Sequence, residues 1–340
     1  MGITWHKGAR GEKMKNRTTA VILIIALIFF LGIGGVYGLR QVQTQNIPVS
    51  TSGDILYACT DHSFTRNGIL VHLDCMTKEG ERPEKQILLT HGVTYSSHEF
   101  DADYEDYSLV RFLARNGYAV WRIDIAGYGQ SGSVSDGFLP DTEYAAEDIA
   151  AAVNEIVRLS GKDQIDMLGW SWGTVTAGRY AAEHPEYLRR LVLYAPILTG
   201  IGEYEVTEEF HHNTWSHAME DFQMDENGQL DETVTDPVLA EIYCSNCWRY
   251  DGDRSPNGGR RDICVDKTET LIDFSALRTV TLLLYGDRDP YLNLERIEAD
   301  KSLLPEGSKA EKFSGGSHVM MYEKPRYHEF QETLISFLSS

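Results

Sequence analysis

The chain has 340 residues and a formal net charge of −20, so it is long enough to bury a large hydrophobic core. Its charge is uneven, because residues 1–17 contain five Lys or Arg side chains against Glu12 alone, which leaves about −24 on the rest of the chain. A body this acidic repels polyanions, and we therefore exclude nucleic acid as a partner.

An uncharged, apolar segment covers residues 18–38 and is long enough to cross a bilayer as a helix of about 20 residues. Because basic flanks stay in the cytoplasm, we expect residues 1–17 to form a cytoplasmic tail and residues 39–53 to link the helix to an extracytoplasmic domain. The chain is thus expected to be a single-pass protein of the cell membrane with an uncleaved signal anchor. Two alternatives stay open: a signal peptide cleaved near Leu39, which would give a secreted protein, and a buried helix of a soluble protein.

The stretch at residues 57–76 predicts a β-hairpin. A three-residue loop at residues 66–68, with Gly68 in the left-handed conformation, would place Cys59 opposite Cys75. In an oxidising compartment these two thiols would then form a cross-strand disulfide.

The other cysteines and the histidines do not have the spacing of a metal site. The pairing of Cys244, Cys247 and Cys264 stays open, and the His-rich stretch at residues 211–217 favours a solvated loop. We expect no metal and no cofactor.

Short apolar runs alternate with helical patterns from residue 86 onward. This alternation predicts an α/β fold with a doubly wound, mostly parallel sheet that is covered by helices on both faces. The pattern breaks at residues 198–278, which hold 18 acidic and 6 basic side chains. We interpret these residues as an inserted acidic cap over the carboxyl edge of the sheet, and residues 54–197 and 279–340 as the core of the domain.

The stretch from Gly169 to Gly173 reads Gly-Trp-Ser-Trp-Gly and lies between an apolar run and a helical pattern. A sharp turn from a strand into a helix forces its tip residue into a strained backbone conformation, which the absence of side chains at Gly169 and Gly173 permits. The Ser171 hydroxyl would then stand clear of the backbone at the carboxyl end of a strand, where a nucleophile would be placed.

A serine hydroxyl needs a base to attack a carbonyl at neutral pH, and that base needs a third group to orient it. Later strand ends supply both: Asp287 and Asp289 follow one apolar run, and His318 follows another after two glycines. The serine, aspartate, histidine order with a Gly-x-Ser-x-Gly turn resembles the α/β-hydrolase family, from about residue 55 to the C-terminus apart from the cap. The resemblance implies a triad of Ser171, Asp289 and His318, because the family's acid stands three residues after the strand-end glycine.

The same resemblance implies an oxyanion loop that begins at the His-Gly pair of residues 91–92. In the family, two backbone N–H groups hold the negative charge that develops on the substrate oxygen, and here they would belong to Val93 and Trp172.

The resemblance favours hydrolysis of small to medium carboxylic esters through an acyl-enzyme. Tyr95, Trp170 and Tyr291 would line the substrate pocket or fill the core. The runner-up is an aminopeptidase similar to proline iminopeptidases, in which cap carboxylates hold the free amino group of a short peptide substrate. Acyl transfer to an acceptor other than water and a non-catalytic binding protein on the same fold are further alternatives.

Overall fold

The computed structural model describes residues 55–340, which lie within one compact unit. The predicted cytoplasmic tail, membrane span and linker, at residues 1–53, lie outside the described residues. No helix in the described part of the chain is both long and apolar enough to span a bilayer.

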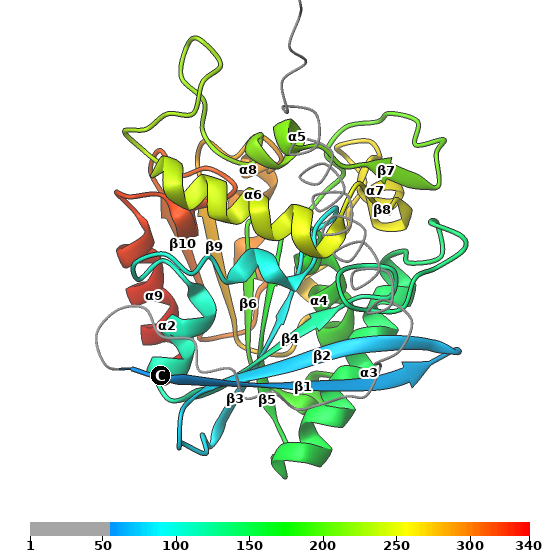
Figure 1. The fold of residues 1–340 in the computed structure, drawn as a ribbon, viewed down its shortest axis with the longest axis vertical. Helices are drawn as coiled ribbons and strands as arrows, with labels where there is room; N and C mark the ends of the chain where they lie inside the picture. Colours follow the sequence, from blue (N-terminus) through cyan, green and yellow to red (C-terminus); the bar gives the residue numbers. More distant parts are fainter. Residues whose placement is uncertain (1–54) are drawn as a thin grey trace, which may run out of the picture. The chain divides into compact units, whose positions relative to one another are not determined.

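The centre of the domain is an eight-stranded sheet with the order β1-β2-β4-β3-β5-β6-β9-β10 (Figure 1). The first three strands in this order are antiparallel neighbours, and all further pairs are parallel, as the alternating sequence pattern predicted. The strands are β1 (Tyr57–Arg66), β2 (Ile69–Lys78), β3 (Lys85–Thr90), β4 (Tyr118–Asp124), β5 (Ile165–Trp170), β6 (Leu188–Tyr194), β9 (Thr281–Gly286) and β10 (Lys309–Phe313).

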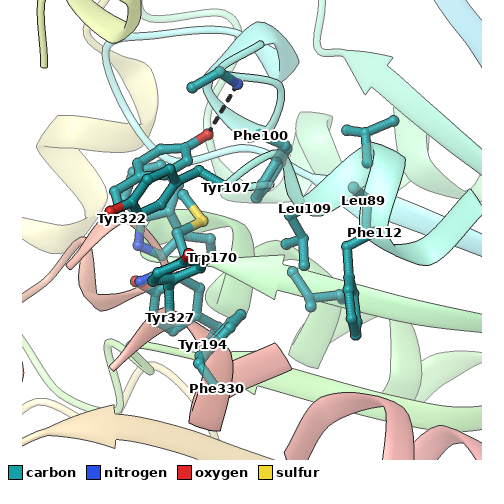
Figure 2. Packing of buried hydrophobic residues seen from close by; sticks show 14 of the residues in the cluster. Leu89, Phe100, Tyr107, Leu109, Phe112, Trp170, Tyr194, Tyr322, Tyr327 and Phe330 are labelled. Carbon is teal, nitrogen blue, oxygen red and sulfur yellow. Dashed lines mark hydrogen bonds between the residues drawn. The ribbon is translucent and has the colours of Figure 1, made fainter. Parts of the chain in front are cut away.

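Two separate hydrophobic cores lie on the two faces of this sheet, because helices cover both. On one face pack α2 (Leu109–Arg115) and α9 (Tyr327–Ser339), and on the other pack α3 (Thr142–Ser160), α4 (Trp172–Glu183) and α8 (Leu294–Asp300). Figure 2 shows the first core, where Trp170 and Tyr194 stack with ring centroids 5.8 Å apart and Phe330 of α9 packs against Tyr194. Both faces of the parallel strands are therefore buried, which explains their continuous apolar sequences.

The β1–β2 hairpin has a different register from the predicted one, and the prediction of a Cys59–Cys75 disulfide is therefore wrong. Its loop has two residues, Asn67 and Gly68, with φ angles of +49° and +81°, so Arg66 pairs with Ile69. The shorter loop shifts the register by one residue and places Cys59 opposite Met76. Because successive side chains point to opposite faces of a sheet, Cys59 and Cys75 face apart, and both are free thiols.

The segment between β6 and β9 contains more regular structure than its sequence suggested. It holds β7 (Phe210–His212), α5 (Trp215–Met219), α6 (Pro237–Asp251), β8 (Arg254–Pro256) and α7 (Gly258–Ile263). The helix α6 begins with Pro at its first turn, and the Asp236 side chain caps it by accepting from the Val238 N–H at 2.9 Å. Cys244 and Cys247, whose pairing the sequence left open, are buried free thiols on this helix. In Figure 1, α5, α6 and α7 lie together over one end of the central strands.

Short 3₁₀ helices complete the description: η1 (Ser97–Phe100), η2 (Pro185–Tyr187), η3 (Phe274–Ala276), η4 (Lys301–Leu303) and η5 (Met320–Tyr322). Of these, η1 matters for the site, because it continues the loop that follows β3 and all four of its residues are buried.

Candidate active site

Ser171 lies at the tip of the turn that joins β5 to α4. Its backbone has φ +57° and ψ −125°, a strained conformation for a residue with a side chain. The two flanking glycines are required by close backbone approaches. A Cβ atom on Gly169 would lie 2.1 Å from the Gly173 carbonyl oxygen, and one on Gly173 would lie 2.2 Å from the Thr90 carbonyl oxygen.

His318 and Asp289 form a buried pair in the loops after β10 and β9. The His318 Nδ1 atom lies 2.7 Å from Asp289 Oδ2, while Asp289 Oδ1 accepts a hydrogen bond from the Tyr291 N–H at 3.0 Å. Asp287, the other acid of this turn, instead accepts from the Gly315 N–H at 2.6 Å and is exposed. The geometry thus places Asp289, and not Asp287, against the imidazole.

The position and charge of His318 are set by its surroundings. Its carbonyl oxygen accepts hydrogen bonds from Trp170 Nε1 at 3.0 Å and from the Tyr194 hydroxyl at 2.8 Å, which fixes the backbone beside the ring. Burial lowers the pKa of His318, but the carboxylates of Asp289 and Asp221 outweigh it, and the pKa is raised above its ordinary value. A raised pKa makes the imidazole a stronger base once it is neutral.

The loop after β3 lies directly against the serine. A Cβ on Gly92 would lie 3.2 Å from Ser171 Cβ, and the Val93 N–H has no hydrogen-bond acceptor among residues 55–340. The Trp172 N–H belongs to the first turn of α4, where N–H groups have no partner within the helix. Two unpaired donors beside Ser171 suit the predicted oxyanion hole.

His91 holds this loop in place. Its Nε2 atom accepts from the Ile125 N–H at 3.1 Å, so the proton sits on Nδ1, which donates to the Gly92 carbonyl oxygen at 2.8 Å. Thr94, three residues after His91 in the same loop, has φ +94°, so the loop also carries backbone strain.

Ser171 and His318 both line a cavity of about 220 Å³. The three aromatic residues predicted for the pocket, Tyr95, Trp170 and Tyr291, line it as well. Apolar lining comes mainly from Ile197, Ile201 and Ile263.

Four polar residues of the cavity wall were not found from the sequence: Glu99, His217, Asp221 and Arg260. His217 was expected in a solvated loop, but its Nδ1 atom lies 3.3 Å from the Tyr95 hydroxyl, and burial lowers its pKa to about 4. No sequence motif marks any of the four, because they come from η1 and from the segment between β6 and β9, far from the triad in the chain.

Comparison with known proteins agrees with this geometry. A family model described as alpha/beta hydrolase fold matches residues 85–242. Residues 85–242 thus resemble the α/β-hydrolase family, and the chain has the α/β-hydrolase fold. The protein described as Serine hydrolase BPHL, from Mus musculus, is 32% identical over 171 residues, which are 50% of this chain and 51% of that protein. The chain thus spans about half the length of this curated relative.

Solved α/β-hydrolase structures share the fold over most of the chain. The enol-lactonase from Burkholderia xenovorans LB400 has a TM-score of 0.62 at 17% identity, and the alignment covers 82% of this chain and 100% of that one. The naproxen esterase (carboxylesterase NP) from Bacillus subtilis has a TM-score of 0.56 at 18% identity and covers 82% and 91%. At these identities the similarity establishes the fold alone.

Two acidic side chains, the buried Glu99 and the half-buried Asp221, line the cavity. Glu99 accepts from the Gly92 N–H at 2.8 Å, and Asp221 accepts from the Tyr243 hydroxyl at 2.9 Å. Neither forms an ion pair within residues 55–340. Burial raises the pKa of Glu99 well above its usual value and also raises that of Asp221, which the nearby His318 and Arg260 lower in part.

Asp251 ties the end of α6 to the loop after β3. Its Oδ2 atom accepts from the N–H and the hydroxyl of Ser96, at 2.9 and 3.0 Å, and its Oδ1 atom accepts from the Gly129 N–H at 2.9 Å. Burial raises the pKa of Asp251 to about 7, while these donors favour the ionised form. One carboxylate thus joins the helix α6, the loop beside Ser171 and the turn after β4.

Within residues 55–340, one group of side chains has ligand atoms close enough for a metal: Cys59, Asp61 and Asp74 lie within 4.8 Å of one another. The Arg122 guanidinium donates to both oxygens of Asp74, at 2.8 and 2.5 Å, and its positive charge opposes a cation there. None of the three residues lines the cavity.

Proposed function

We propose that this α/β-hydrolase cleaves small to medium carboxylic esters with Ser171 as nucleophile, His318 as general base and Asp289 as the group that orients the imidazole. The observation that carries this proposal is the combination of two features on one cavity. His318 is hydrogen-bonded to Asp289 at 2.7 Å, and Ser171 occupies the strained tip of the turn at the wall of the same cavity.

The first half of the reaction forms an acyl-enzyme. Ser171 Oγ attacks the carbonyl carbon, His318 Nε2 takes the hydroxyl proton, and the proton then passes to the oxygen of the leaving alcohol as the ester bond breaks. The N–H groups of Val93 and Trp172 stabilise the negative carbonyl oxygen. In the second half, water attacks the acyl carbon and loses a proton to His318, which then returns it to Ser171 Oγ as the acyl–oxygen bond breaks and the acid leaves.

The cavity favours a small substrate. Its volume of about 220 Å³ is below the roughly 300 to 1,000 Å³ of sites for drug-sized ligands. Because bulky aromatic and isoleucine side chains line so small a cavity, a short acyl chain or a small alcohol group fits it better than a long lipid chain.

Labelling with a fluorophosphonate tests the mechanism, because this reagent reacts with an activated serine. We expect the wild-type chain to be labelled and Ser171→Ala to lose all labelling while its circular dichroism spectrum is unchanged. Undiminished labelling of Ser171→Ala would show that the nucleophile is another residue. A wild-type chain that is folded but not labelled would favour a non-catalytic binding protein.

A second candidate function, aminopeptidase activity, is favoured by Asp221 and Glu99, which line the cavity and form no ion pair within residues 55–340. A substrate ammonium group would supply the missing charge. The exposed acids Glu203, Glu205, Glu208 and Glu209 do not share this position. The deciding experiment compares short-chain esters with alanyl and prolyl anilides, each with a free and an acetylated amine. Efficient turnover of free-amine anilides alone would replace the esterase by an aminopeptidase.

We also propose that residues 18–38 anchor the protein in the cell membrane and that the catalytic domain lies outside the cytoplasm. The proposal rests on the apolar run and its basic N-terminal flank. The domain should then remain in the membrane fraction and be cut by protease added to intact cells. Recovery of a soluble chain that starts near Leu39 would instead establish a cleaved signal peptide and secretion.

A further inference from the structure

Arg260 is a cation on the wall of the catalytic cavity. It lies on α7, and this short helix packs against the residue that follows the nucleophile: a Cβ on Gly259 would lie 2.4 Å from the Trp172 ring. The helix therefore brings a guanidinium group to the same cavity as Ser171 and His318.

The partners of this guanidinium are all uncharged. Its Nε donates to Asn257 Oδ1 at 3.2 Å, an Nη2 N–H donates to Thr94 Oγ1, and the neighbouring Tyr204 hydroxyl is neutral as well. Arg260 forms no ion pair with any acid among residues 55–340. Since a guanidinium has five N–H donors and Arg260 lines the cavity, part of its hydrogen-bonding capacity is left for a ligand.

Arg260 is also held in position before any ligand binds. Asn257, which accepts its Nε–H, is buried and fixed by three hydrogen bonds: its N–H donates to the carbonyl oxygens of Gly137 and Glu209, and its Nδ2 donates to the Glu208 carbonyl oxygen. A fixed guanidinium loses little conformational freedom when it binds an anion, which favours binding.

Several other arginines have carboxylate partners, which Arg260 lacks among residues 55–340. Arg261, the next residue, lies 3.8 Å from Asp141 and 3.9 Å from Asp262, and the buried Arg111 and Arg122 pair with aspartates. The planar fork of a guanidinium matches the two oxygens of a carboxylate. The missing partner of Arg260 is therefore an anion that comes with the ligand.

The acids that face the same cavity do not fill this role. Glu99 and Asp221 line the cavity with Arg260, but neither is within 4.0 Å of a cation. Glu99 is bonded to the Gly92 N–H and Asp221 to the Tyr243 hydroxyl, so each is held by a partner of its own.

We propose that Arg260 binds a free carboxylate of the substrate, so that the preferred substrates are half-esters of short dicarboxylic acids. This inference rests on the proposed function and adds the substrate class to it. The small cavity places the carboxylate and the ester carbonyl only a few bonds apart.

Three ethyl esters of similar size test the proposal: ethyl hydrogen glutarate, which is anionic, ethyl pentanoate, which is neutral, and ethyl 4-aminobutanoate, which is cationic. We expect the wild-type protein to hydrolyse the glutarate ester with the highest kcat/KM. Arg260→Gln should lower the ratio of glutarate to pentanoate kcat/KM by roughly ten- to a hundredfold, the effect of one lost charge-assisted hydrogen-bond pair, and Arg260→Lys should restore part of it. Arg261→Gln is the matched control and should leave the ratio unchanged.

A binding measurement separates this inference from the proposed function. Calorimetric titration with glutarate requires no turnover, and we expect Arg260→Gln to bind it at least tenfold more weakly than the wild-type protein does. Equal binding by both proteins, an unchanged substrate ratio, or a preference for the cationic ester would overturn the role of Arg260. The wild-type protein could instead bind glutarate through Arg260 but show neither ester hydrolysis nor fluorophosphonate labelling. This result would overturn only the esterase proposal.

Discussion

Replacement of Gly173 by alanine tests whether the turn at Ser171 is set by backbone contact. The new Cβ would lie 2.2 Å from the Thr90 carbonyl oxygen, about 1 Å closer than an ordinary carbon–oxygen contact. The conflict is with backbone at the end of β3, which cannot rotate away as a side chain can. The start of α4 and the loop after β3 must therefore separate by about that distance, and a shift of this size at reacting groups costs roughly 100-fold in rate.

The assay is kcat on ethyl pentanoate, with thermal unfolding measured in parallel. Gly178→Ala is the matched control, because it makes the same substitution in the same helix and its Cβ meets only the Ile272 side chain at 3.0 Å. We expect Gly173→Ala to lose about 100-fold in kcat and to remain folded, while Gly178→Ala stays within about threefold. Wild-type activity in Gly173→Ala would refute the argument that backbone contact fixes the turn.

Further predictions address the acid, the pH profile and the thiols. Asp289→Asn should lower kcat by about 10⁴-fold, whereas Asp287→Asn, which alters an exposed contact to the Gly315 N–H, should change it only slightly; the reverse pattern would exchange their roles. Since neutral His318 is the active form and Asp221 helps to raise its pKa, activity should fall as the pH drops through that raised pKa, and Asp221→Asn should move this fall to lower pH. A shift to higher pH would contradict this reading of Asp221. Mass spectrometry without reductant should find Cys59 and Cys75 as free thiols, and linked peptides with a mass lower by two hydrogen atoms would contradict the register described here.

The order of strands and helices was predictable because each has a strong local pattern. The apolar run before Ser171 and the helical pattern after it became β5 and α4. The register of the first hairpin was not predictable to the residue, because Asn67-Gly68 suits both a two-residue turn and the end of a three-residue loop. A difference of one residue in that loop moved Cys59 from Cys75 to Met76.

The residues of the site also divide into those that the sequence predicted and those that it did not. Ser171, Asp289 and His318 were predicted together because parallel strands bring their carboxyl ends to one edge of the sheet, and the resemblance to the family selected Asp289 over Asp287. Asp221 and Arg260 were missed, since their approach to the cavity depends on how the segment between β6 and β9 packs. The helix α6 was missed because its burial comes from tertiary contacts, and its apolar residues mix with Ser, Asn and Cys.

The three hydrogen bonds of Asp251 have a mechanical consequence. Because the Asp251 side chain accepts hydrogen bonds from both Ser96 and Gly129, the end of α6 cannot move away from the sheet while these bonds hold and the loop after β3 stays in place. Any motion that lifted it would pull on the segment that carries Val93, three residues before Ser96, and so would move an N–H group that the proposed mechanism assigns to the oxyanion hole.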